Sequence, residues 1–200
     1  MYKKNPLSPH LQIYKWHLSM ILSITHRIIG IVNSVAMILI CLWTISLLFG
    51  EENYEIIKIL FQSFFGKLLI ISLSWSFSFH ILSEIRHLIW DLGYGFDLKI
   101  SKITGIITII GSLALTILIN LTSIYDESYT EIVNFFSKTS TKALYSLFLI
   151  AAFSFFSLTI SEVFEDYIKN EKIKNVATKM LYVFAIVIPL ITILSILSLN

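Results

Sequence analysis

Five long apolar runs dominate this sequence, and they determine the class of fold before any motif is considered. The runs cover residues 19–49, 68–90, 103–121, 141–164 and 177–199. A transmembrane α-helix needs about 20 consecutive apolar residues, so each run is long enough to cross a bilayer. We therefore expect an all-α integral membrane protein built as a bundle of five transmembrane helices.

Composition supports this class and excludes several others. The chain is 56% hydrophobic and 14% charged, and its mean hydropathy of +0.80 is too high for a soluble domain of 200 residues. The net charge of +2 gives no reason to expect a nucleic-acid partner. Cys41 is the single cysteine, so neither an internal disulfide nor a thiolate metal cluster is possible. The sequence also lacks a strand followed by a Gly-rich turn, which a dinucleotide-binding fold would need.

The distribution of basic residues predicts the orientation of the bundle. If the N-terminus lies on the cytoplasmic or matrix side, most basic residues fall on that side: Lys3, Lys4, Lys15, Arg27, Arg86, Lys99, Lys102, Lys169, Lys172, Lys174 and Lys179. Lys58, Lys67, Lys138 and Lys142 fall towards the other side. This asymmetry follows the positive-inside rule, so we expect an inside N-terminus.

The second apolar run carries a stripe of ionisable residues. His80, Glu84, His87 and Asp91 have offsets of 4, 7 and 11, which place them along one face of a helix. Ionisable groups within a membrane are costly unless they face protein, water or a cofactor, so the stripe predicts a functional site. The alternative is a packed helix interface without further function.

Two separated motifs resemble those of one known family. His80 is followed, after a spacer, by Arg-His-Leu-x-x-Asp-x-Gly at residues 86–93, and residues 23–30 read Ser-Ile-Thr-His-Arg-Ile-Ile-Gly. The N-terminus contributes Pro-Leu-Ser-Pro-His-Leu at residues 6–11, with Tyr14. In this order, the motifs resemble the larger membrane-anchor subunit, a cytochrome b, of succinate dehydrogenase.

The resemblance implies a function and a set of site residues. It implies an anchor that docks the flavoprotein and iron–sulfur subunits and forms the ubiquinone-reduction site, with haem b bound through His80 as an axial iron ligand. His26, Arg27 and His87 would contact the haem propionates, and Ser23 and Arg27 would line the quinone site. Succinate oxidation itself would occur in the partner subunits, so this chain would be non-catalytic alone.

The C-terminal part carries a shorter resemblance. Residues 165–168, Glu-Asp-Tyr-Ile, resemble the end of the second helix of the small anchor subunit, whose Asp-Tyr pair contributes the quinone-site tyrosine. We therefore expect a cytochrome b anchor-like part at 1–121 joined to a small-anchor-like part at 122–200. The alternative is an unrelated C-terminal extension. Asp166 and Tyr167 would then join Ser23 and Arg27 at the inner membrane face.

The second axial ligand of the haem is missing from this pattern. In the family it is a histidine of the small subunit, and counting back from Tyr167 puts Phe155 at that position. Phenylalanine cannot ligate iron. Three outcomes stay open: another chain supplies the ligand, His80 binds haem alone, or haem has been lost. We expect haem to be retained, because an unused His80 inside the bilayer would be costly.

The sequence leaves other functions to consider besides a succinate dehydrogenase anchor. An anchor of a quinol:fumarate reductase and a haem-free structural anchor remain alternatives. A transporter would predict inverted repeats or broken helices in corresponding halves, and the sequence shows neither. The C-terminal part would correspond to the last two helices of the small anchor subunit, so the first helix of that subunit has no counterpart here. A further small membrane subunit is expected as a partner, to fill that place.

The N-terminal segment and the compartment complete the sequence-based expectations. Residues 1–18 are polar and aromatic, and they should lie at the headgroup level, either docking an extrinsic partner or acting as an interfacial anchor. No cleavable presequence is recognisable ahead of the matched motif. We therefore expect a multi-pass protein of an inner membrane, either of a bacterial cell or, if organelle-encoded, of mitochondria.

Overall fold

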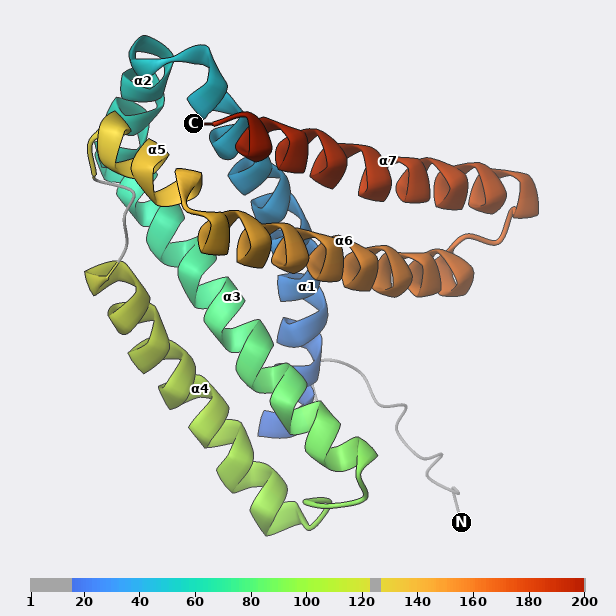
Figure 1. Cartoon of the computed structure of the whole chain (residues 1–200). Helices are drawn as coiled ribbons and strands as arrows, with labels where there is room; N and C mark the ends of the chain where they lie inside the picture. Colours follow the sequence, from blue (N-terminus) through green and yellow to red (C-terminus); the bar gives the residue numbers. More distant parts are fainter. Residues whose placement is uncertain (1–15, 123–126, 200) are drawn as a thin grey trace, which may run out of the picture.

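A computed structural model of the chain describes residues 16–122 and 127–199, and over these ranges the protein is a bundle of helices without strands (Figure 1). Five helices are long and apolar enough to cross a membrane, which confirms the five-span prediction. They are α1 (Leu18–Ser46), α3 (Phe64–Asp91), α4 (Leu98–Leu121), α6 (Thr139–Tyr167) and α7 (Glu171–Ser198). Most of the N-terminal segment expected at the headgroup level lies outside the described residues.

Two short helices lie in the connections between spans. A 3-10 turn, η1 (Leu47–Phe49), leads from α1 into α2 (Glu51–Gln62), as expected for a partly helical connection. The N-cap residue of helix α5 (Tyr129–Ser137) is Ser128. The Ser128 hydroxyl accepts a hydrogen bond from the backbone N–H of Glu131, and the Glu131 carboxylate accepts one from the backbone N–H of Ser128. This capping box explains why a helix begins in a connection that the apolar pattern left unassigned.

Helix α3 occupies the centre of the first three spans, between α1 and α4 (Figure 1). The interior here combines small and polar side chains with an apolar cluster of Leu22, Ile29 and Phe79. Every buried residue of α4 is small: Ser101, Gly105, Thr108, Ser112 and Thr116. In lipid, small residues allow helix backbones to approach closely, and buried hydroxyls can bond back to their own helix. Close backbone packing therefore holds α4 against its neighbours.

Helices α6 and α7 form an antiparallel hairpin that is attached to the C-terminal half of α1. Met37 and Cys41 of α1 pack with Leu149 and Phe153 of α6. In Figure 1 the hairpin crosses α1 and α3 steeply and its tip extends away from them. Helix α7 continues through Pro189 as one helix. The division into parts at residues 121 and 122 stays a prediction.

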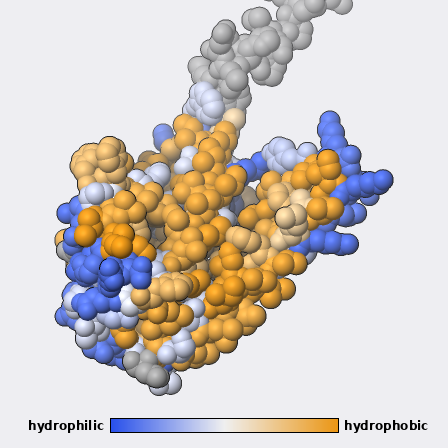
Figure 2. Space-filling view, turned by 90° about the horizontal axis from the view of Figure 1, so that it is seen from above, coloured by the Kyte–Doolittle hydropathy of each residue, from blue (hydrophilic) through white to orange (hydrophobic). Residues whose placement is uncertain are grey.

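The outer surface of the bundle is apolar over a wide area. Figure 2 shows hydrophobic residues across the face in view, with hydrophilic residues gathered at the tip of the α6–α7 hairpin and on the side where α2 and α5 lie. Large apolar side chains are exposed on all five spans. Such a surface requires lipid or partner helices around it, so the protein is an integral membrane protein.

Candidate functional site

Three histidine rings from two helices form a stack between α1 and α3. The ring of His26, on α1, lies between those of His80 and His87, which stand two turns apart on α3. Its centroid is 4.6 Å from the His80 centroid and 4.9 Å from the His87 centroid, with interplanar angles of 11° and 27°. The predicted stripe on α3 is therefore confirmed for His80 and His87 as a face directed at α1.

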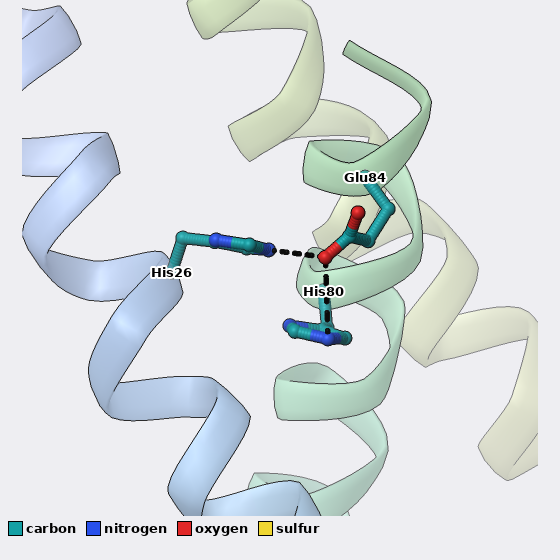
Figure 3. Close-up of side chains that lie close together, drawn as sticks. All are labelled: His26, His80 and Glu84. Carbon is teal, nitrogen blue, oxygen red and sulfur yellow. Dashed lines mark ion pairs between the residues drawn. The ribbon is translucent and has the colours of Figure 1, made fainter. Parts of the chain in front are cut away.

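A carboxylate joins this stack. Figure 3 shows Glu84, one turn beyond His80 on α3, with its side chain directed towards both His26 and His80. Its Oε1 lies 3.0 Å from Nε2 of His26 and 3.7 Å from Nε2 of His80. The three possible ligand atoms all lie within 4.8 Å of one another. We refer to His26, His80 and Glu84 as the histidine–carboxylate cluster.

The two ring nitrogens of His80 lack hydrogen-bond partners among the described residues. His80 is 9% exposed, and neither of its ring nitrogens makes a hydrogen bond within the part of the chain that the structure describes. Nε2 of His26 lies 3.0 Å from Oε1 of Glu84, a contact that becomes an ion pair when the ring is protonated. Buried polar atoms are nearly always satisfied, so unsatisfied nitrogens at one point indicate a site for a metal or cofactor.

Backbone features on both helices position the rings. Nδ1 of His87 lies 2.8 Å from the Ser83 carbonyl oxygen, and since a carbonyl only accepts, Nδ1 carries the proton. Gly30 of α1 faces His80: a Cβ at this glycine would lie 3.7 Å from Cε1 of the ring. The ring of His80 therefore packs close to the α1 backbone, and a long side chain at position 30 would collide with it.

Arg86 contacts helix α4 and not the histidine–carboxylate cluster. Its guanidinium donates to the carbonyl and hydroxyl oxygens of Ser101, both at 3.1 Å, and to the Thr104 hydroxyl at 3.2 Å. It also lies over the Trp90 ring, 4.0 Å from the centroid. Although Arg86 is near the expected inner face, it is buried towards α4. It joins α3 to α4 and is turned away from the cluster.

Phe155 of α6 lies beside His80, as the count from Tyr167 predicted. The two ring centroids are 6.3 Å apart and the planes meet at 68°. Phenylalanine offers no ligand atom, so α6 does not supply a second axial ligand at this position. Whether haem is retained stays a prediction.

The residues expected at the quinone site are only partly brought together. Ser23 and Arg27 are exposed and stand one turn apart on α1. Asp166 and Tyr167 are exposed at the C-terminal end of α6. Figure 1 shows this end extending away from the N-terminal end of α1, so the two pairs do not share a pocket in this arrangement.

Two features were missed by the sequence-based site assignment. Glu84 was placed on the stripe but given no role, although a carboxylate one turn from a histidine inside a span was a signal for one. An apolar cavity of about 320 Å³ also lies between the helices, lined by Asn33, Phe77 and Phe148 among others. No motif indicated this cavity, because its lining comes from residues that are individually ordinary in a span.

The fold and the cluster together define a polytopic α-helical membrane protein with a histidine–carboxylate site between its first two spanning helices. This class of protein includes redox subunits that hold a cofactor inside the bilayer.

Sequence comparison identifies the family. Residues 1–119 match the model of the family described as succinate dehydrogenase/fumarate reductase transmembrane subunit, so the chain belongs to that family. It is 37% identical over 119 residues to the succinate dehydrogenase cytochrome b556 subunit of Rickettsia conorii, covering 60% of this chain and 93% of that protein.

Two further relatives extend the comparison beyond one genus. The cytochrome b556 subunit of Paracoccus denitrificans is 31% identical over 113 residues, which cover 56% of this chain and 87% of the relative. The mitochondrial cytochrome b560 subunit of Mus musculus is 38% identical over 119 residues, which cover 54% and 69%. These matches bear out the resemblance of the first three spans. The resemblance of the α6–α7 hairpin to the small anchor subunit stays a prediction.

Proposed function

We propose that this chain anchors the flavoprotein and iron–sulfur subunits of a succinate dehydrogenase to an inner membrane and forms the site of ubiquinone reduction there. The observation that carries the proposal is the buried, hydrogen-bond-free His80 inside a bundle whose first three spans match the family. The relatives are named as cytochrome subunits of that enzyme. Its N-terminus would face the cytoplasm or matrix, in keeping with the distribution of basic residues.

His80 is the residue that would hold haem b. The fit is favourable at this residue, because a ring nitrogen without a hydrogen bond is free to bind iron. Haem supplies a one-electron carrier within the membrane when it is bound. His26 stacks on His80, His87 stacks on the other side of His26, and Arg27 follows His26 at an exposed position, so these three would pair with the propionates. A further small membrane subunit would provide the second axial ligand.

Ser23 and Arg27 would bind the quinone headgroup. Quinone reduction adds two electrons and two protons, and negative charge develops on the quinone oxygen during the reaction. A guanidinium and a hydroxyl one turn apart can both donate to that oxygen and stabilise the charge. Asp166 and Tyr167 would complete the site by delivering protons and a phenol donor. This part of the proposal requires α6 to bring that pair towards α1 when the partner subunits are bound.

Purification of the tagged full chain from its own membranes tests this function. We expect two soluble subunits carrying flavin and iron–sulfur clusters to copurify, and the preparation to reduce ubiquinone with succinate. Succinate oxidation by a soluble dye acceptor serves as the control, because it needs only the extrinsic subunits. A chain that copurifies with neither subunit would contradict the proposal.

A further inference from the structure

We propose that His26, His80 and Glu84 also form a binding site for a divalent transition-metal ion of the Zn²⁺ type. The ion would occupy the histidine–carboxylate cluster in the haem-free protein. This inference does not depend on the proposed redox function, although the two sites share His80. It concerns the cluster itself, which neither the resemblance nor the comparisons assign to a simple metal ion.

The spacing of the three ligand atoms suits such an ion. Zinc binds histidine nitrogen and carboxylate oxygen at about 2.0–2.2 Å, so neighbouring ligand atoms around a tetrahedral ion are roughly 3.3–3.6 Å apart. The Glu84 oxygen lies 3.0 Å from His26 Nε2 and 3.7 Å from His80 Nε2, on either side of that spacing. All three ligand atoms lie within 4.8 Å of one another. The rings of His26 and His80 are stacked at 11°, so their side chains would have to rotate to direct one nitrogen from each ring at the ion.

The unsatisfied atoms support the same reading. Nε2 of His26 lies 3.0 Å from the Glu84 carboxylate, a separation at which either a proton on Nε2 or a metal ion joins the two atoms. A proton there leaves both ring nitrogens of His80 without a hydrogen-bond partner, whereas an ion would bind His80 as well. Arg86, the nearest permanent cation on the same helix, is committed to Ser101 and Thr104. The imidazoles of His26 and His80 face the Glu84 carboxylate, and a bound ion would neutralise its charge.

The ligand set also indicates the kind of ion. Imidazole suits zinc, copper, cobalt and nickel, whereas magnesium and calcium prefer an all-oxygen shell. Three protein ligands leave at least one position open for water. The Glu84 side chain is 39% exposed and that of His26 is 19% exposed, which leaves a path for the ion to enter.

Occupation by a small ion and by haem would exclude each other, because both use a ring nitrogen of His80. Zn²⁺ would then slow haem insertion into the newly made chain, and haem insertion would release the ion. Glu84 separates the two functions, since it is a ligand for the small ion only.

The test uses the full chain produced in cells deprived of haem and purified in detergent. Binding of Zn²⁺ alone is measured by competition with a chromophoric chelator. We expect one equivalent to bind per chain, and Glu84→Gln and His26→Ala each to weaken binding at least about tenfold, since even outer-sphere partners contribute that much. His17→Ala is the matched control: this exposed histidine at the start of α1 lies outside the cluster, and binding should be unchanged.

Haem reconstitution gives a second measurement on the same proteins. Preloaded Zn²⁺ should slow the appearance of the haem spectrum in the wild-type chain and leave the rate unchanged in Glu84→Gln. The Glu84→Gln chain should still take up haem, which shows that it is folded. Absence of zinc binding in the wild-type chain, or equal binding in wild type and Glu84→Gln, would overturn the inference. Failure of the redox function would instead appear as loss of haem or quinone reduction with zinc binding intact.

Discussion

The ring of Phe155 in α6 stands beside the ring of His80 in α3, with 6.3 Å between their centroids. Two imidazoles bound to opposite sides of one metal ion have centroids roughly 6 Å apart, because each metal–nitrogen bond is about 2 Å long. Phe155 thus occupies a position from which a histidine could share a metal ion with His80. Counting back along the sequence from Tyr167 places Phe155 where the second axial ligand of the haem is expected, and the distance between the two rings agrees with that count.

Phe155→His should therefore supply a second axial ligand within this chain. In haem-loaded chain made without partner subunits, we expect wild type to show five-coordinate haem and Phe155→His to show six-coordinate, low-spin haem. Optical and electron paramagnetic resonance spectra distinguish these states. Phe156→His is the matched control, because Phe156 packs in the cluster around Met37 and Cys41. A five-coordinate Phe155→His variant would show that α6 does not approach the iron.

Removal of a donor from the proposed quinone site should slow quinone reduction selectively. We expect Arg27→Leu to reduce the succinate–ubiquinone rate by about 10²-fold, the effect of losing one donor to a developing oxyanion, and Ser23→Ala to act in the same direction. Succinate oxidation with a dye acceptor should not change. Ser72→Ala is the control, since this exposed serine lies near the opposite end of the second span. Equal losses with ubiquinone and with the dye would argue against a quinone site here.

Substitution of Arg86 should destabilise the α3–α4 pair and leave the cluster intact. Arg86→Lys keeps the charge but loses the fork that donates to Ser101 and Thr104. We expect the free energy of unfolding to fall by about 1–3 kcal/mol, measured by denaturant titration in mixed micelles. A double-mutant cycle with Ser101→Ala should show a positive coupling, and Lys102→Ala, on an exposed neighbour, should have little effect. A changed haem spectrum in Arg86→Lys would instead place this residue at the cofactor.

The capping box of α5 should respond to acid. The hydrogen bond from the Ser128 hydroxyl, 2.8 Å from the Glu131 carboxylate, and the one from the Ser128 amide hold the pKa of this carboxyl below its usual range. Because the pKa of Glu131 is lower in the folded helix than its unfolded value of about 4.3, the ionised carboxylate stabilises the helix at pH values above about 4.3. This stabilisation is lost as the pH falls through the folded pKa. A carboxyl NMR titration should therefore give Glu131 a midpoint below about 4.3. Glu131→Gln can keep the capping box and should remove the pH dependence of α5. A midpoint at or above about 4.3 would contradict the hydrogen bonds from Ser128 to the Glu131 carboxylate.

The spans and the stripe could be predicted because each depends on one helix at a time. Apolar runs fix where a chain can cross a bilayer, and spacings of four and seven fix which residues share a face. His80, Glu84 and His87 were placed correctly on that basis. The capping box at Ser128 and Glu131 was also readable from its spacing, although it was not used.

Contacts between helices could not be predicted in the same way. The insertion of His26 between His80 and His87 depends on the rotation and relative height of α1 and α3, which no periodicity within one helix determines. The direction of Arg86 depends on small residues of α4 that leave space for its guanidinium. The meeting of Tyr167 with Arg27 was inferred from a shared membrane face, but the path of the α6–α7 hairpin decides that distance, and here it separates them.

The central claim is that His80 binds haem iron. The most direct measurement is a dithionite-reduced-minus-oxidised optical spectrum of the detergent-purified complex, compared with the same complex carrying His80→Ala. His17→Ala provides the matched control, because His17 is exposed at the start of α1 and outside the cluster. We predict a b-type haem signal in wild type and in His17→Ala that is lost in His80→Ala. No haem signal in the intact complex, or a signal unchanged by His80→Ala, would contradict this claim.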